Sequence, residues 1–458
     1  MDLNKKNATE DHVSSPTVSL EAVIYTAIID AYENRDVAVI DIPNAFIQTD
    51  FEGEKVIMKV RGKLAEILVS TSPELYKPYV TYENGQMVLY LVVKKALYGM
   101  LQSALLFYKK LRKDLESIGF EINPYDPCVA NKIINGKQMT LCWHVDDLKT
   151  SHADTKVVDE FIKWAKEKYE DDKIGEVKAS RGKEHDYIGM DMDFSSKGEV
   201  KIKMTKYTKK MLDGFKYQDE LGSTAKTPAS EHLFKVNKDG KKLSKQKAEV
   251  FHTEVAKCLF LCKRARPDIQ LAVAFLCTRV SNPDEDDWKK LLRLLNYLKG
   301  TIDMHLTLSA DGTNKIFWYV DAAFAVHPDY RSHSGGTMTM GKGAAAASSL
   351  KQKMNSKSSC EAELLGVDDM SGSMIWTMYF LQAQGYKFDT TLYQDNQSTK
   401  LLLEHGKASS SKRTRHINIR HYFLTDRIER GEFKVKYCST DNMLADYFTK
   451  PLQKQKQY

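Results

Sequence analysis

Three aspartates in the first third of the chain have the chemistry of a divalent-metal site. Asp41 ends the apolar, β-branched run 36–42, and Asp146 and Asp147 end a second run that starts near residue 138. If the two runs are neighbouring strands, three carboxylates converge and raise one another's pKa, and a bound cation removes this conflict. Oxygen ligands suit Mg²⁺, with Mn²⁺ as the alternative, and two such ions can activate a hydroxyl and steady a leaving group at phosphorus. The plainer alternative is that Asp41 caps a helix and the aspartate pair marks a turn.

A second set of four acids lies in the last third of the chain. Two of them end strand-like runs, one lies in the first turns of a long helical pattern, and one lies in the last predicted helix. In chain order they are Asp321, Glu363, Asp395 and Asp446. Singly, each is explained by a surface charge or a helix cap, but the order and placement of all four favour a second metal site.

The elements that position the first set alternate between strands and helices. Helical spacing is present over 19–34, 101–118 and 157–169. Strand-like runs lie at 36–42, 56–60 and 87–93, and Asn135-Gly136 predicts a hairpin between two further runs. The order of strand, helix, hairpin, helix and strand indicates a split βαβ unit.

The second half of the chain has a different pattern. A hairpin is predicted over 187–204, a lysine-rich stretch runs to about residue 247, and two or three helices follow, the last over 284–299. From residue 315 we expect three strands, a long helix over 359–384, a strand, further helices, a strand and a final helix that Asp441 begins as its N-cap. This order describes a mixed α/β domain.

The composition sets broad limits on the class of protein. A chain of 458 residues exceeds one typical core, which indicates two to four domains. Its 42% hydrophobic and 28% charged residues are typical of globular proteins, and a net charge of +7 suits a polyanionic partner. Seven scattered cysteines indicate a reducing, intracellular compartment. No apolar run reaches the ~20 residues of a membrane helix, so we expect no membrane partner.

The motifs around these acids resemble one family. IDIPNAF (40–46) is similar to the first catalytic motif of copia-type LTR retrotransposon reverse transcriptases, and HVDD (144–147) resembles their Tyr-Val-Asp-Asp box. ADYFTKPL (445–452) resembles the closing motif of the family's ribonuclease H, and the second set of acids matches the order of that nuclease. The resemblance covers about residues 15–455.

The resemblance implies a role for each acid. Asp41, Asp146 and Asp147 become the metal ligands of a polymerase, and the second set becomes the ligands of two Mg²⁺ ions in a nuclease. It also favours Glu363 over the neighbouring Glu361.

Two further residues acquire roles at the nucleotide. Phe46 is implied as the side chain that excludes a ribose 2′-hydroxyl, and Gln102 is implied to lie near the incoming dNTP. The alternatives are a core aromatic residue and a surface amide on a helix. The sequence departs from the family pattern at Lys149, where an apolar residue is usual.

Basic residues in two segments are candidates for contact with nucleic-acid phosphates. The candidates are Lys203, Lys206, Lys209, Lys412, Arg413, Arg415 and His416. A solvated lysine-rich face is the alternative interpretation.

Together, these features predict an α/β (α+β) multidomain protein. We expect a flexible lead over 1–15, a reverse transcriptase with a ferredoxin-like palm, fingers and thumb over 16–227, a helical connection over 228–312 and a ribonuclease H-like α/β domain over 313–458. Short chain before the palm and the absence of protease and integrase motifs suggest a mature product or a fragment of a longer polyprotein.

The predicted function is RNA- and DNA-directed DNA synthesis joined to ribonuclease H cleavage, with two metal ions in each site. The implied partners are an RNA template, a DNA primer, the RNA–DNA hybrid, dNTPs and polyprotein products such as integrase and capsid. The expected location is a cytoplasmic virus-like particle or the nucleus. The alternatives are a nucleic-acid-binding relic and a protein with ribonuclease H activity alone.

Overall fold

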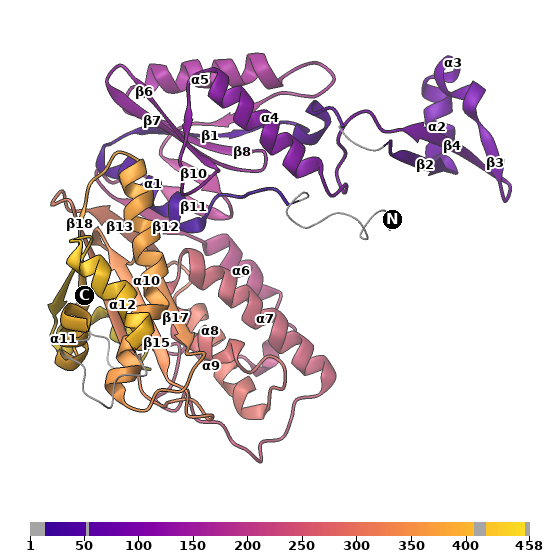
Figure 1. Cartoon of the computed structure of the whole chain (residues 1–458). Helices are drawn as coiled ribbons and strands as arrows, with labels where there is room; N and C mark the ends of the chain where they lie inside the picture. Colours follow the sequence, from indigo (N-terminus) through magenta and orange to yellow (C-terminus); the bar gives the residue numbers. More distant parts are fainter. Residues whose placement is uncertain (1–13, 52–54, 407–417, 454–458) are drawn as a thin grey trace.

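The protein is described by a computed structural model that covers residues 14–51, 55–406 and 418–453. These residues form a central mass of packed sheets and helices, from which one small subdomain stands apart (Figure 1). One hydrophobic core runs through the central mass from α1 (Leu20–Tyr32) to β19 (Lys434–Tyr437). None of the helices in the described ranges is both long and apolar enough to cross a membrane.

A sheet of six strands, which we call the palm sheet, carries the first set of acids. Its order is β5-β6-β7-β8-β1-β9. The strands are β1 (Asp36–Asp41), β5 (Glu121–Ile122), β6 (Val129–Ile134), β7 (Lys137–His144), β8 (Asp147–His152) and β9 (Lys178–Ser180). The helices between them are α4 (Ser103–Ser117) and α5 (Thr155–Tyr169). The β7-β8-β1-β9 order is that of a split βαβ, ferredoxin-like unit, as predicted.

Local chemistry explains the boundaries in this part. Asn135 and Gly136 both have positive φ (52° and 72°), which is the turn geometry that joins β6 and β7 in register. Ser19 caps α1 by accepting from the backbone N–H of Ala22. One strand was missed: residues 147–152 form β8, although their side chains are mostly polar.

Polar side chains fill the core between β8 and α1. Lys149, 1% exposed, forms a buried ion pair with Asp30, and the Ser151 hydroxyl donates to the same carboxylate at 2.5 Å. Arg35 lies 3.7 Å from Asp30 and donates to Thr140 at 2.9 Å. The unusual lysine after the aspartate pair therefore ties β8 to α1.

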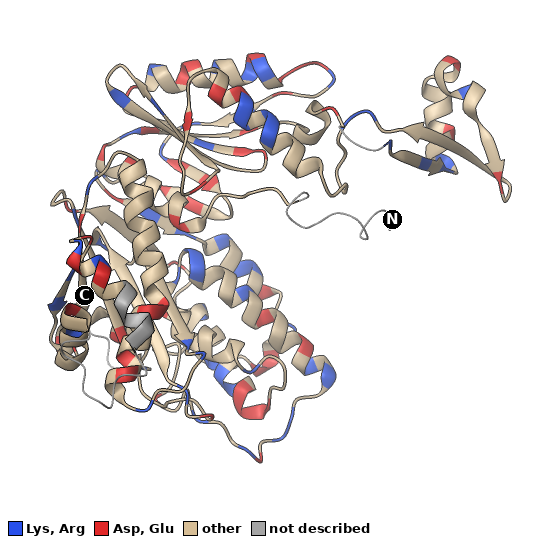
Figure 2. Cartoon of the chain, viewed as in Figure 1, with Lys and Arg blue, Asp and Glu red and all other residues tan. Residues whose placement is uncertain are grey.

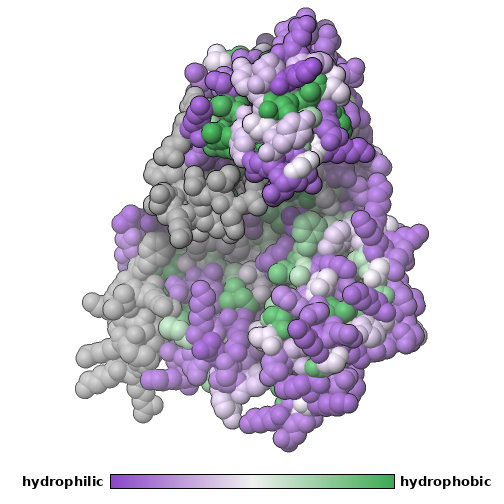
Figure 3. Space-filling view, turned by 90° about the vertical axis from the view of Figure 1, so that its right-hand side faces the viewer, coloured by the Kyte–Doolittle hydropathy of each residue, from purple (hydrophilic) through white to green (hydrophobic). Residues whose placement is uncertain are grey.

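The small subdomain that stands apart, residues 55–95, has a thin core of its own. It contains β2 (Ile57–Arg61), α2 (Lys63–Thr71), α3 (Pro73–Tyr76), β3 (Thr81–Glu83) and β4 (Gln86–Val92), with a sheet order of β2-β4-β3. Only Val60, Ala65 and Leu89 form its buried cluster. Hydrophobic side chains therefore remain at its surface (Figure 3), among them Leu64, Ile67 and Tyr82.

A second sheet joins segments that are distant in the sequence. Its order is β10-β11-β12-β13-β16, and its strands are β10 (Glu184–Tyr187), β11 (Met190–Asp193), β12 (Val200–Lys203), β13 (Leu306–Ala310) and β16 (Gly341–Lys342). The predicted hairpin over 187–204 corresponds to β11 and β12. Because β13 pairs with both β12 and β16, this sheet crosses the expected domain boundaries near residues 227 and 312.

Four helices lie between β12 and β13 in the sequence. They are α6 (Thr205–Asp213), α7 (Lys245–Arg264), α8 (Gln270–Cys277) and α9 (Glu285–Gly300). Asp284 forms a capping box with Asp287, which explains the start of α9 at the predicted position.

The last part is a mixed sheet with order β17-β15-β14-β18-β19. It contains β14 (Lys315–Ala323), β15 (His333–Thr339), β17 (Ala346–Lys351), β18 (Asp389–Gln394) and β19, together with α10 (Ser359–Ala383), α11 (Gln397–His405) and α12 (Asn418–Glu429). The predicted final helix is wrong: residues 440–442 and 444–448 form two short 3₁₀ turns, and Asp441 lies inside the first turn instead of capping a helix.

The last part packs directly on the palm. Tyr25 of α1 lies within hydrogen-bond distance (3.0 Å) of Thr377 of α10, and the Trp376 indole donates to the Tyr125 carbonyl at 3.0 Å. Arg35 also donates to the Tyr386 hydroxyl at 2.9 Å. In Figure 1, α10 runs from the palm to the sheet of the last part, so this helix contacts both.

Candidate active sites

The palm acids lie where β1 ends and β8 begins. Asp41 is directly opposite Asp147 in the antiparallel pairing of these strands. Directly opposite residues share a face of the sheet, so both carboxylates point to the same side. Asp146 lies in the turn before β8, and its carbonyl accepts from the Ile42 backbone N–H at 3.2 Å, which holds the turn against the end of β1.

The turn that presents Asp146 has an unusual backbone. Two residues, Val145 and Asp146, connect β7 to β8, and His144 pairs with Asp147 across the turn. Val145 has a φ of 61°, a left-handed conformation that a β-branched residue rarely adopts. Such strain persists only where the surroundings enforce it, and it is common at functional sites.

Burial and mutual repulsion raise the pKa values of the aspartate pair. Partial burial, with the nearby Asp146 and Asp41, raises the pKa of Asp147 to about 6. Partial burial also raises the pKa of Asp146, and Asp41 adds to this effect. Asp41 itself is exposed, so this cluster is open to solvent on one side.

An aromatic pair lies next to the palm acids. The ring centroids of Phe46 and Tyr98 lie 4.4 Å apart, and Tyr98 is 57% exposed. Burial raises the pKa of Tyr98, and the charges of Asp146 and Asp41 raise it further, which places its hydroxyl near these acids. Gln102 is the partly buried residue that precedes α4.

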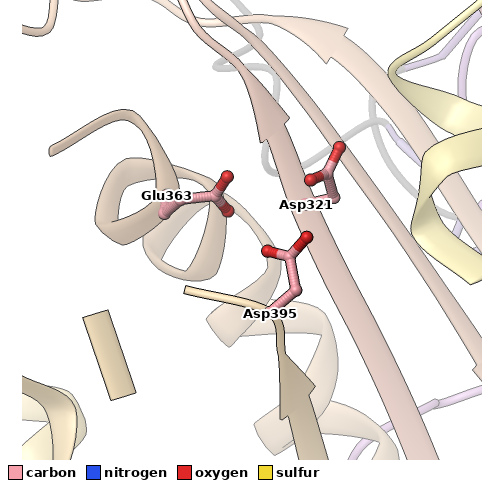
Figure 4. Close-up of side chains that lie close together, drawn as sticks. All are labelled: Asp321, Glu363 and Asp395. Carbon is pink, nitrogen blue, oxygen red and sulfur yellow. The ribbon is translucent and has the colours of Figure 1, made fainter. Parts of the chain in front are cut away.

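The second set of acids forms a tighter cluster. Asp321, Glu363 and Asp395 each offer an oxygen within 4.8 Å of the others (Figure 4). Asp321 and Glu363 are buried, at 2% and 6% exposure. The carboxylate oxygens of these three acids therefore lie close enough to one another to bind a single metal ion.

Three elements bring these acids together. Asp321 lies near the end of β14, and Asp395 directly follows β18, which runs parallel to β14. Glu363 lies in the first turns of α10, which packs on β14. The competing Glu361 accepts from the Lys357 backbone N–H at 2.7 Å, so it closes the start of the helix while Glu363 faces the cluster.

The electrostatics of this cluster suit a cation. Burial raises the pKa of Glu363 to about 9, and Asp321 and Asp395 contribute to the shift. The Oε2 atom of Glu363 is buried and has no hydrogen-bond partner among the described residues. A divalent ion with oxygen ligands satisfies both the unpartnered atom and the repulsion.

Asp446 lies beside this cluster on the second 3₁₀ turn. Its Oδ1 accepts from the Lys450 ammonium at 2.6 Å, and the same ammonium lies 3.5 Å from Asp321. The Thr449 hydroxyl also donates to Asp321. Asp446 therefore contacts the other acids through Lys450, a residue that the sequence did not single out.

Comparisons with known proteins agree on one family. The family model described as reverse transcriptase (RNA-dependent DNA polymerase) matches residues 4–230. The chain is 25% identical over 462 residues to the retrovirus-related Pol polyprotein from transposon TNT 1-94 of Nicotiana tabacum, and 25% identical over 445 residues to that from transposon RE2 of Arabidopsis thaliana. These alignments cover 99% and 96% of this chain but only 32% and 28% of the relatives.

The fold points the same way. The foamy viral protease-reverse transcriptase, solved in complex with an RNA/DNA hybrid, superposes with a TM-score of 0.51 at 12% identity, over 97% of this chain and 48% of that one. The chain contains a reverse transcriptase region of the copia-type LTR retrotransposons. The mixed α/β fold with several sheets is the one expected for this family.

The basic candidates of this copia-type reverse transcriptase are placed unevenly. Lys203 forms an ion pair with Asp193 at 2.9 Å, which competes with contact to a phosphate. Lys206 and Lys209 are exposed on α6, where basic side chains are frequent (Figure 2). Lys412, Arg413, Arg415 and His416 lie outside the described residues.

Tyr98 is a candidate residue that the sequence analysis missed. Its place in the sequence, more than fifty residues after Phe46, gives no sign of contact between the two rings. An exposed aromatic residue next to a cluster of acids is visible only after folding.

Proposed function

We propose that the chain is an RNA- and DNA-directed DNA polymerase that also cleaves RNA in RNA–DNA hybrids. The observation that carries the proposal is the presence of two separate groups of acids in one chain with a reverse transcriptase region. Asp41 lies opposite Asp147 in the β1–β8 pairing, and oxygens of Asp321, Glu363 and Asp395 lie within 4.8 Å of one another. Each cluster has the donor type that Mg²⁺ or Mn²⁺ prefers.

At the palm, Asp41, Asp146 and Asp147 are the residues to hold the metal ions. Bound ions would supply activation of the primer hydroxyl and neutralisation of triphosphate charge. The chain's own contribution is position: the β1–β8 pairing fixes two carboxylates on one face, and the strained turn fixes the third. Phe46, buttressed by Tyr98, is the proposed check against ribonucleotides, and Gln102 is the proposed neighbour of the dNTP.

At the second cluster, Asp321, Glu363, Asp395 and Asp446 are the proposed ligands of a two-ion nuclease site. Bound ions would position a water molecule and neutralise the phosphate that is cut. Because Glu363 is buried beside two other acids, its ionised form is unfavourable without a cation. A bound cation would stabilise the ionised form.

We propose an RNA template, a DNA primer and their hybrid as partners, because the solved relative binds an RNA/DNA hybrid. The Pol polyprotein relatives suggest further contacts with other products of the same polyprotein, such as integrase and capsid, inside a particle or in the nucleus. The lead, reverse transcriptase, connection and ribonuclease H regions over 1–15, 16–227, 228–312 and 313–458 remain our proposed division of roles.

Primer extension tests the polymerase. The purified chain should extend a DNA primer on an RNA template with Mg²⁺, and Asp146→Asn should reduce the rate by about a thousandfold. The same variant should still cleave the RNA of a preformed hybrid, whereas Glu363→Gln should show the reverse pattern.

The results also separate the alternatives. Cleavage without extension in the unmodified chain would support a protein with nuclease activity alone. Hybrid binding without either reaction would support a nucleic-acid-binding relic and contradict the proposal.

A further inference from the structure

Lys450 is a cation already placed among the acids of the second cluster. Its ammonium lies 2.6 Å from Asp446 Oδ1 and 3.5 Å from Asp321 Oδ1. Its side chain is 38% exposed, so it reaches into the site from the solvent side. The acid partners, in contrast, are almost fully buried.

The cluster is therefore divided into two unequal sides. On one side, Asp321, Glu363 and Asp395 come within 4.8 Å of one another, and Glu363 Oε2 has no partner among the described residues. On the other side, the Asp446 carboxylate is occupied by Lys450. A first divalent ion would find three oxygen donors on the open side, whereas a second ion between Asp321 and Asp446 would compete with the ammonium.

We propose that Lys450 is a built-in counter-ion that keeps the second metal position closed until a phosphodiester arrives. This inference rests on the proposed nuclease function. The exposed lysine chain can leave the acids without disturbing the core, and the phosphate of an RNA–DNA hybrid offers its ammonium another anionic partner. Binding of the second ion is then coupled to binding of the substrate. Lys450 is a positioning residue in this scheme, since it acts through the two acids.

The dependence of second-ion binding on the hybrid distinguishes this role of Lys450 from a purely structural role. A lysine that only braces the 3₁₀ turn would affect stability and leave metal affinity unchanged. A lysine that occupies the second position would lower the affinity of the free protein for the second ion, and binding of the hybrid would restore that affinity.

The experiment measures Mn²⁺ binding by calorimetry and by electron paramagnetic resonance. All proteins carry Asp146→Asn and Asp147→Asn, so that the palm acids do not contribute. Lys450→Met is compared with the parent, with Lys450→Arg, which keeps the charge, and with Lys400→Met, which removes a similar i,i+4 ion pair with Glu404 on α11. The hybrid used as the probe carries 2′-O-methyl RNA, which lacks the free hydroxyls of RNA.

Without hybrid, the parent should bind one Mn²⁺ well and a second weakly. Lys450→Met should bind the second ion about tenfold more tightly or better, because an opposite charge this close changes the proton affinity of a carboxylate by about one to three orders of magnitude. Hybrid should tighten the second ion in the parent but not in Lys450→Met. Lys450→Arg and Lys400→Met should behave like the parent.

Two results would overturn the inference, and they are distinguishable. Equal second-ion affinity in the parent and in Lys450→Met, with cleavage of an ordinary hybrid retained, removes the role of Lys450 and leaves the nuclease intact. No Mn²⁺ binding at this cluster in any of the proteins removes the proposed nuclease function and the inference together. If Lys450→Met does not fold, tight second-ion binding by Lys450→Arg without hybrid also overturns the inference.

Discussion

The palm acids and the second cluster of acids, which we propose to be a nuclease site, are held in position in different ways. In the palm, the carboxylates lie at the edge of a hairpin, with Asp41 exposed and Asp146 on a strained turn. In the second cluster, Asp321 and Glu363 are buried between a sheet and a helix, and Lys450 offsets part of the charge. Oxygens of Asp321, Glu363 and Asp395 thus lie within 4.8 Å of one another inside the protein, whereas the palm acids face solvent on one side.

The support beneath the two clusters also differs. One apolar core lies beneath both clusters, but the palm strand β8 also packs on a buried ion pair between Lys149 and Asp30. Removal of one partner from such a pair leaves an uncompensated charge in the core. The palm is therefore the more vulnerable of the two supports.

The largest expected effect tests this support. Lys149→Met should lower the free energy of unfolding by about 3–5 kcal/mol, because Asp30 loses its buried partner. Chemical denaturation measures the change. The control is Lys163→Met, which removes an exposed pair with Glu167 and should change stability by less than about 0.5 kcal/mol. A loss below about 1 kcal/mol in Lys149→Met would mean that the ion pair does not support β8.

The second prediction compares metal binding in the absence of nucleic acid. Mg²⁺ should raise the melting temperature of the wild-type chain through the preformed nuclease cluster, with a stabilisation of about 2.7 kcal/mol at a hundredfold excess over Kd. This shift should survive Asp146→Asn and disappear in Glu363→Gln. An equal shift in all three proteins would show that the two clusters do not differ in this way.

The third prediction concerns pH in the metal-free protein. The pKa of Glu363 is raised to about 9, above an ordinary value of about 4, so the folded state holds this proton more tightly than the unfolded chain. The resulting stabilisation is complete below about pH 4 and is lost as the pH rises through about 9. The glutamine of Glu363→Gln does not titrate. The melting temperature of this variant, relative to that of the wild type, should therefore rise as the pH increases from about 4 to about 9.

Asp147 provides the contrast for the same measurement. Its pKa is raised only to about 6, so the advantage of Asp147→Asn should develop between about pH 4 and pH 6 and then stay constant. Identical pH windows for the two variants would contradict the difference in burial between the clusters.

The smallest effect is expected at the palm turn. Val145→Gly removes a left-handed strain of about 1–2 kcal/mol but adds the greater flexibility of glycine, so stability should rise by less than about 1 kcal/mol. Primer extension should slow because the aspartate pair is held less firmly. The control is Asn135→Gly in the β6–β7 turn, where asparagine already tolerates a positive φ. Unchanged extension in Val145→Gly would separate the strain from catalysis.

Features set by local chemistry could be predicted from the sequence. The hairpin at Asn135-Gly136, the helix α1 after its Ser19 cap and the strand that ends in Asp41 follow from turn, cap and periodicity rules. Three of the four acids in the second predicted set, Asp321, Glu363 and Asp395, lie close together, and two of them lie at or near the end of a strand.

Features that depend on distant partners could not be predicted. Strand β8 was missed because Lys149, Thr150, Ser151 and His152 are polar, and their burial depends on partners such as Asp30, more than one hundred residues away. The prediction of a final helix was wrong because, over so few residues, short 3₁₀ turns have nearly the same spacing of apolar residues as an α-helix. Lys450 and Tyr98 were missed because only the fold brings them to the acids.

The sheet that contains β12, β13 and β16 has a consequence for how this polypeptide can be divided. Strand β13 hydrogen-bonds to a strand that precedes the four helices and to another that follows β15. Proteolysis in the polar stretch before α7 would therefore leave two pieces that stay associated through backbone pairing. Exchange of the last part, residues 313–453, for that of a relative would have to replace an edge of this shared sheet, so the two parts are expected to be inherited as one unit.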